Sequence, residues 1–353
     1  MIDIKTLDLF ILTLFSHGDK ARISTLYHLL RGKRTASILI YGYFYYCLPF
    51  FGLLPQLTES DYHKTVQRLS AAGFLIISED NLAAITQIGQ DCLQNADLFQ
   101  PLPHLDGYRF AGQDELFWEI LTFATQVLSE KSHGNNQYIP LESNVYRQKI
   151  FKRWLKQQPE NASQLLYNEW YLFLQSLPEK DALLFASQLS GYLRTGLTLQ
   201  QAADNRQEEI LRTELTFKNH LHHLMSAATQ KVSVFPLMKS LTEQFTVHSG
   251  NQSAAETFSL FCQGMSAEAI AVRRRLRPNT IYDHIIDCSF QDAGFPYLTL
   301  LSDEETAILS GYRQQHPNVR NWQWQEVHSR HPQLTYHGMR FYQLACVQKE
   351  VVR

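Results

Sequence analysis

Apolar residues recur at helical spacing through the start of the chain, which predicts a first amphipathic helix. One face of it carries Leu7, Phe10, Ile11, Leu14 and Phe15. Ser24 precedes a second helical segment that we expect to stop at Gly32, because serine favours helix starts and glycine favours helix ends. A third helix is predicted to begin at a Thr58 cap and to end at Gly73.

The period then changes from helix to strand between Gly73 and Thr86, in the segment GFLIISEDNLAAIT. Two short apolar runs flank an acidic turn at Glu79–Asn81, which is typical of a β-hairpin. Thr86 is placed to cap one more helix. Helices followed by a hairpin indicate a winged-helix-like domain, to which we assign residues 1–105.

Helical periodicity continues without strands through the middle of the chain. We assign residues 106–247 to an all-α domain that includes one long predicted helical segment, Leu197–Ala227. Pro101, Pro103 and Gly107 indicate a linker before it, and the polar segment Thr246–Ser253 indicates a linker after it.

The segment Thr35–Thr58 contains no charged residue and is long enough for a membrane span. Prolines, glycines and four tyrosines interrupt it, and tyrosine suits a membrane interface better than its centre. We therefore predict no membrane span. We predict an aromatic-rich helix that is buried between domains or under a partner.

The last hundred residues contain the pattern of a helix-turn-helix, GMSAEAIAVRRRLRPNTIYDHI, at 264–285. Gly264 can close a first helix with a positive φ, Ser266 is a good cap for the second, and Pro278 suits the first turn of the third. The apolar interior is predicted to consist of Ile270, Ala271, Leu276, Ile281 and Ile285. This domain is assigned residues 253–353.

Three features depart from the usual helix-turn-helix pattern of the LuxR and sigma-factor type. Ala269 stands where an acid is usual, with Glu268 one place early. Arg274 stands where a buried apolar residue is common, and Arg277 replaces the usual serine cap of the third helix. If Ile281 and Ile285 face inward, the third helix offers Asn279, Tyr282 and Asp283 outward, and none of these is an arginine able to read guanine.

The arginines lie instead at the end of the second helix and in the turn, where they would meet phosphates. We predict a phosphate clamp with low sequence specificity. The candidate nucleic-acid-binding residues in this domain are Arg273, Arg274, Arg275, Arg277, Asn279, Thr280, Tyr282 and His284. A second basic group that follows a helix end in the first domain adds Arg31, Lys33 and Arg34.

One helical segment of the middle domain, at 146–158, carries five cations together with Tyr146, Phe151 and Trp154. Charge and stacking together could hold single-stranded nucleic acid there. The alternative is a solvated helix face above core aromatics.

The composition restricts the function classes. The apolar fraction of 44% excludes a disordered chain, and the net charge of −2 means that any basic surface is local. The five cysteines are scattered and never spaced as CxxC, so a reducing cytosol is expected. Acidic Asp3 and Asp8 stand where a signal peptide would be basic, so the expected location is the cytoplasm or the nucleoid.

The sequence offers no recognisable catalytic or metal site. It lacks a GxxxxGK[ST] phosphate loop and a nucleophile elbow, and NHLHH at 219–223 supplies only two suitably spaced histidines. We expect no enzymatic activity, cofactor, metal or small-molecule substrate.

The chain resembles the YpbB-like family, bacterial helix-turn-helix proteins encoded beside a RecQ-type DNA helicase. The segments that carry the resemblance are YHLLRGKRTASIL at 27–39, FFGLLPQL at 50–57, the helix-turn-helix itself, and LTYHGMRFYQLAC at 334–346. The resemblance implies a DNA-binding accessory role beside a RecQ-type helicase in repair or recombination.

The prediction is therefore a mainly α protein that binds DNA and works with such a helicase. The aromatic segment Tyr41–Phe51 and the helical body are the candidates for the protein contact. Two alternatives stay open: a transcriptional regulator that reads an operator, and an interaction scaffold that binds no DNA.

Overall fold

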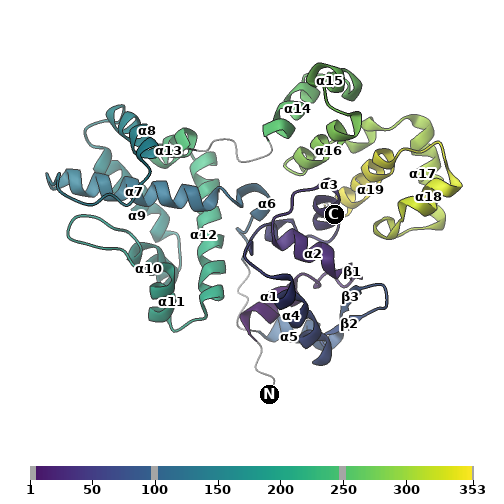
Figure 1. The fold of residues 1–353 in the computed structure, drawn as a ribbon, viewed down its shortest axis with the longest axis horizontal. Coiled ribbons are helices and arrows are strands. Elements are labelled where there is room, and N and C mark those ends of the chain that lie inside the picture. Colours follow the sequence, from purple (N-terminus) through teal and green to yellow (C-terminus); the bar gives the residue numbers. More distant parts are fainter. Residues whose placement is uncertain (1–4, 97–101, 246–251, 352–353) are drawn as a thin grey trace. The chain divides into compact units, whose positions relative to one another are not determined.

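The computed structural model describes residues 5–96, 102–245 and 252–351, and nineteen α-helices within them confirm a mainly α protein (Figure 1). These residues form two compact units. The first unit comprises the described parts of 1–22, 30–32 and 49–249, and the second those of 23–29, 33–48 and 250–353. The predicted division at 105 and 247 stays a proposal, and most of the linker predicted at 246–253 lies outside the described residues.

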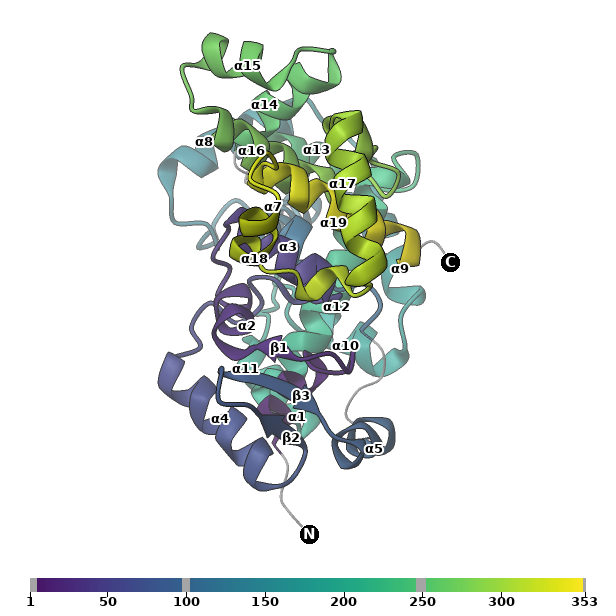
Figure 2. The same cartoon turned by 90° about the vertical axis from the view of Figure 1, so that its right-hand side faces the viewer.

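The first half of the first unit contains helices and one small sheet. Its elements are α1 (Thr6–Thr13), β1 (Ala21–Arg22), α4 (Glu59–Ala71), β2 (Leu75–Ile77), β3 (Leu82–Ile85) and α5 (Gln87–Asn95). The hairpin is confirmed, with Leu75 paired to Ile85. β1 adds a third antiparallel strand, which the sequence pattern does not predict because it has only two residues. The sheet order is β1-β3-β2 (Figure 2).

Local capping chemistry places these helices. The Thr58 and Thr86 hydroxyls accept hydrogen bonds from the amides of Asp61 and Gly89, as a helix N-cap requires. The Ser24 cap is wrong: β1 runs directly into α2 (Ile23–Leu30), so Ser24 lies inside the first turn.

The second half of the first unit is all helical. Its elements are α6 (Gly107–Phe110), α7 (Asp114–Ser132), α8 (Val145–Lys156), α9 (Ala162–Gln175), α10 (Glu179–Ser187), α11 (Leu199–Arg206), α12 (Ile210–Gln230) and α13 (Pro236–Phe245). The single segment predicted at 197–227 is two helices, because Gln207 adopts a left-handed conformation with φ 54° between them.

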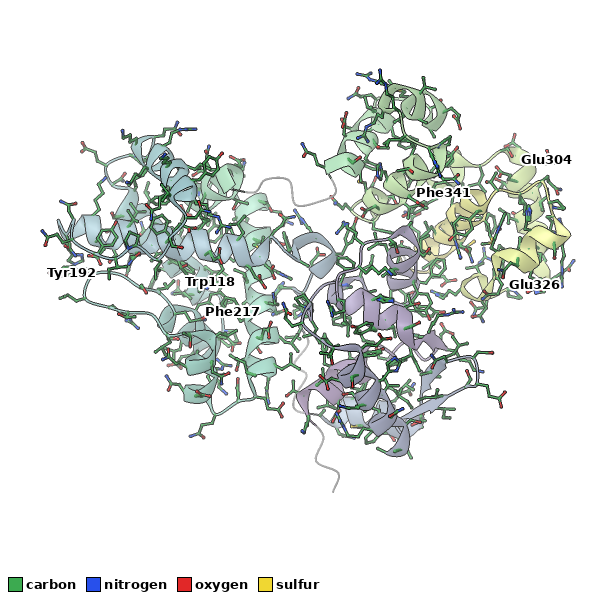
Figure 3. The ribbon with its side chains drawn as sticks, in the orientation of Figure 1. Trp118, Tyr192, Phe217, Glu304, Glu326 and Phe341 are labelled. Carbon is green, nitrogen blue, oxygen red and sulfur yellow. The ribbon has the colours of Figure 1, made fainter. Side chains whose placement is uncertain are left out.

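Aromatic packing fills the core of this helical half. Trp118 meets Phe217 edge-on at 4.9 Å between ring centroids (Figure 3), and Phe217 stacks on Phe185 at 4.8 Å. One buried ion pair crosses the core: the Lys218 ammonium lies 2.8 Å from the Asp114 carboxylate.

The second unit joins the C-terminal helices to a segment from near the N-terminus. Its elements are α2, α3 (Ala36–Phe44), α14 (Gln252–Cys262), α15 (Ala267–Arg274), α16 (Pro278–Ser289), η2 (Tyr297–Leu300), α17 (Asp303–Gln315), η3 (Val319–Asn321), α18 (Trp324–Arg330) and α19 (Tyr336–Val351). A short helix, η1 (Leu48–Phe50), lies at the boundary between the two units.

The charge-free segment is divided among α3, η1 and the loops that follow. Ile38, Leu39, Ile40 and Phe44 are buried, and α3 packs on α16 and α19. The apolar side of α3 is thus part of the core of the second unit. Within the described ranges, every helix is too short or too polar to traverse a bilayer.

Candidate nucleic-acid interface

The helix-turn-helix is formed by α14, α15 and α16, and local signals set its boundaries. Gly264 follows α14 with φ 88°, the Ser266 hydroxyl accepts from the Ala269 amide at 3.2 Å, and Pro278 begins α16. Ile270, Ile281 and Ile285 are completely buried between the helices. The predicted geometry of the motif is therefore present.

The turn between α15 and α16 is closed by an arginine. Arg275 ends α15 in the left-handed region with φ 55°, where glycine is the usual residue. The amide of Leu276 then donates to the carbonyl of Ala271 at 3.0 Å, which closes the helix end.

Three arginines of the turn face solvent, and we call them the arginine turn: Arg273, Arg275 and Arg277. No carboxylate of the described residues forms an ion pair with any of them. Val272 beside them is 81% exposed. The arginine turn is therefore a compact, positively charged surface with an apolar residue at its edge.

Arg274 points the other way and serves the structure. Its side chain is only 10% exposed and donates to the Ser253 carbonyl and the Thr257 hydroxyl on α14. It also forms an ion pair with Glu256 at 2.9 Å. Helical spacing could have indicated this, because Arg274 lies four residues after buried Ile270 on the same helix face.

The outward side of α16 is occupied by contacts within the second unit. Asp283 lies 3.2 Å from the His337 imidazole of α19, and Tyr282 stacks on that ring at 5.1 Å between centroids. The Tyr282 hydroxyl donates to Glu268 on α15 at 3.0 Å. Partial burial and then this carboxylate raise the pKa of Tyr282 to about 12. Tyr282 and Asp283 are therefore engaged, although the sequence placed them outward.

The second half of α16 is covered as well. His284 is buried against α14 with its Nδ1 2.9 Å from the Thr257 hydroxyl, and burial followed by the nearby Arg274 charge lowers its pKa. Asp287 receives the guanidinium of Arg34, with the closest atoms 3.0 Å apart. The exposed residues of α16 are confined to its N-terminal end, where Asn279 is exposed and Thr280 half-buried.

The three cations of the N-terminal basic group have different surroundings. Arg31 is exposed and donates to the Leu57 carbonyl at 3.1 Å in the first unit. Lys33 is exposed in the second unit, and Arg34 is the partner of Asp287. Arg34 therefore anchors α3 to α16, a role that the sequence pattern could not indicate.

The comparisons with known proteins agree with this geometry. Residues 253–343 match the family model described as a helix-turn-helix domain. This domain, on a mainly α chain, defines a helix-turn-helix protein and indicates DNA binding.

The chain is 26% identical to Protein YpbB of Bacillus subtilis (strain 168) over 296 residues, which is 82% of this chain and 83% of that protein. The resemblance to YpbB-like helix-turn-helix proteins is thereby confirmed. No solved structure matches the chain significantly.

Proposed function

We propose that this protein is a non-enzymatic DNA-binding accessory factor that holds the phosphate backbone of DNA with low sequence specificity. The observation that carries the proposal is the contrast within one motif. The arginine turn is exposed, while on the outward side of the helix that would read bases Tyr282 and Asp283 are engaged by Glu268 and His337.

Contacts to phosphates position a protein on DNA without reading its sequence, whereas specificity needs side chains at base edges. Asn279 alone offers an exposed amide at the start of α16. The proposed clamp is therefore Arg273, Arg275 and Arg277, with Asn279 and Thr280 beside it. Arg274, Tyr282, His284 and Arg34 are left out, because their polar groups are already used within the unit.

A selection of binding sites from random duplexes tests this function. We expect no sharp consensus, together with duplex binding that weakens steeply as salt rises. A well-defined operator sequence would contradict the proposal and favour a transcriptional regulator. Absence of duplex binding at low salt would favour the scaffold.

We further propose a winged-helix arrangement within residues 5–96. The order of helix α1, strand β1, helices α2 to α4 and the β2–β3 hairpin supports it, as does the small sheet with β1 beside β3. Both α2 and α3 belong to the second unit, and α3 is the additional helix in this order.

The proposed partner is a RecQ-type helicase, in DNA repair or recombination, and this part rests on the family resemblance. The aromatic contact surface is better placed on the helical body than on Tyr41–Phe51. Tyr167 and Tyr171 of α9 are 62% and 54% exposed. In Tyr41–Phe51, Tyr46 is 50% exposed, whereas Phe44, Tyr45 and Phe51 are at most 4% exposed. Exposed tyrosines are favoured in interfaces.

Co-purification with the helicase tests the partner. Tyr167→Ala with Tyr171→Ala should abolish it while duplex DNA binding is retained. Exposed Tyr146→Ala on α8 serves as the matched control. Unchanged co-purification of the α9 variant would contradict this contact, and no co-purification of the unaltered protein would contradict the partnership.

A further inference from the structure

A cationic face runs along α8 in the first unit. Five cations lie on this helix, and Arg147 is neutralised by Glu119 and Glu142 at 2.8 and 3.2 Å. The other four are exposed and form no ion pair with any carboxylate that the structure describes. We call them the cationic face of α8: Lys149, Lys152, Arg153 and Lys156.

Helix geometry aligns these charges. Lys149, Arg153 and Lys156 are separated by four and three residues and therefore share one side. At 1.5 Å per residue, Lys149 and Lys156 lie about 10 Å apart along the helix axis.

The aromatic residues of α8 anchor the helix and do not offer a stacking surface. Phe151 and Trp154 are each 1% exposed, and the Trp154 indole donates to the Ser240 hydroxyl at 2.8 Å. These residues fix the orientation of α8, and the side opposite them carries the cations. Neither ring is presented on the cationic side of α8.

A pocket of about 440 Å³ opens directly beside this face. Its apolar part is lined by Phe123, Val127, Phe151 and Leu155. Its polar part is lined by Lys131, Lys152, Asn135, Asn136, Tyr138 and Gln148. The Asn135 amide already donates to the Glu130 carboxylate at 2.6 Å, and the Gln148 amide donates to the Glu142 carbonyl at 2.6 Å. The polar groups considered for a ligand are therefore Lys131, Lys152, Asn136 and Tyr138. Lys152 belongs both to the pocket and to the cationic face.

The chemistry of the two features is complementary to one kind of ligand. An apolar pocket bordered by amides and a phenol suits a flat ring with hydrogen-bonding edges, and lysines beside it suit the phosphates attached to that ring. A base inside a duplex is stacked and cannot enter such a pocket, whereas a base of a single strand can.

We propose that the first unit carries a second nucleic-acid site, specific for single strands. One unstacked base enters the pocket beside Tyr138, and the neighbouring phosphates lie along the cationic face of α8. The site shares no residue with the arginine turn, so the protein holds duplex and single strand through separate surfaces.

Fluorescence anisotropy with the full chain and a labelled oligothymidine of about 12 nucleotides tests the site, a length within the usual range for single-strand sites. The variant combines Lys149→Ala, Arg153→Ala and Lys156→Ala. Each phosphate contact to a single strand contributes ~0.7 to the slope of log affinity against log salt concentration. The loss of three contacts should therefore reduce this slope by about 2 and weaken binding about a hundredfold at 0.1 M salt.

The matched control removes the same charge from the other site, through Arg273→Ala, Arg275→Ala and Arg277→Ala. It should leave single-strand affinity within about twofold and weaken duplex binding instead, since each phosphate contact is local. Equal losses in both variants, or no loss in the α8 variant, would overturn the proposal. Duplex binding tests the arginine turn, and oligothymidine binding tests the cationic face of α8. The two measurements therefore distinguish a failure of the proposed function from a failure of the second site.

The pocket is tested with an abasic oligonucleotide of the same length. Its affinity should be lower by about 5- to 150-fold for the one base lost from the pocket. Tyr138→Ala, and Asn136→Ala in case the first variant misfolds, should reduce this difference. Equal binding of the abasic strand would overturn the base pocket. A third outcome would also overturn the site. If the unaltered protein sedimented with anionic vesicles, and the α8 variant bound the oligonucleotide with unchanged affinity, the cationic face would be assigned to membranes.

Discussion

Arg273 and Arg274 are adjacent, carry the same charge, and should fail in opposite ways when changed to alanine. Arg273 is exposed, so Arg273→Ala removes one phosphate contact and little else. Each phosphate contact to a duplex contributes about 0.9 to the slope of log affinity against log salt concentration. Duplex affinity should therefore fall about eightfold at 0.1 M salt, evenly across sequences. The free energy of unfolding should stay within about 0.5 kcal/mol of the unaltered value, as for most surface changes.

Arg274→Ala should instead destabilise the motif. The guanidinium is 10% exposed, and its loss leaves the Ser253 carbonyl and the Thr257 hydroxyl without this donor. A charged hydrogen bond of this kind contributes about 2 kcal/mol. Glu256 adds little, because its side chain is 63% exposed and solvent screens the pair.

Two measurements separate the variants. Urea unfolding should show a midpoint about 1 M lower for Arg274→Ala, given a slope of about 2 kcal/mol per molar. Hydrogen exchange in α14–α16 should be faster in that variant alone. When the duplex affinity of Arg274→Ala is corrected for the fraction of folded protein, its dependence on salt should equal that of the unaltered protein. If Arg274→Ala flattened the slope as Arg273→Ala does, with no loss of stability, the division of roles in this turn would be refuted.

Three further predictions concern the first unit. Lys218→Met should destabilise it by about 3–5 kcal/mol in urea unfolding, because the Asp114 carboxylate is 1% exposed and loses its cation; adding Asp114→Asn should recover part of the loss. Gly89→Ala should cost about 1–3 kcal/mol, since the new Cβ would lie 2.5 Å from the Phe74 carbonyl oxygen; Gly112→Ala, in open space but with positive φ, should cost less. Burial, followed by neighbouring positive charges, lowers the pKa of His223 to about 4. As the pH falls from 6.5 towards 4, the unfolded chain therefore binds a proton at this histidine before the folded protein does, and thermal stability should fall. His223→Gln should flatten that decline, and an equal decline in the variant would contradict the assignment.

Local signals were sufficient wherever a few neighbouring residues decide the backbone. Thr58, Thr86 and Ser266 cap helices as predicted, and Pro278 begins α16. Ser24 failed as a cap because the two-residue strand β1 pairs with β3, about sixty residues away in sequence, and so fixes where α2 starts. Two residues are too few to show the alternating pattern that predicts a strand.

The burial of single polar side chains was harder to foresee than the helices that carry them. Tyr282 and Asp283 lie on the side of α16 that the helical period assigns to solvent, yet α19 brings His337 against both. The cations of α8 and their neighbouring aromatics were visible in sequence. Which of them are free was not, because Glu119 reaches Arg147 from another helix.

The mainly α class, the helix-turn-helix with its caps and the cluster of arginines in its turn can all be derived from the amino-acid sequence, because helix periodicity and capping act over four or five residues. Only the tertiary structure decided which polar groups remain free to meet a ligand. Arg34 and Asp287 are 253 residues apart in the chain, and Asp283 and His337 are 54 apart. Such contacts depend on where whole helices pack, and they leave the arginine turn exposed while they cover the helix beside it.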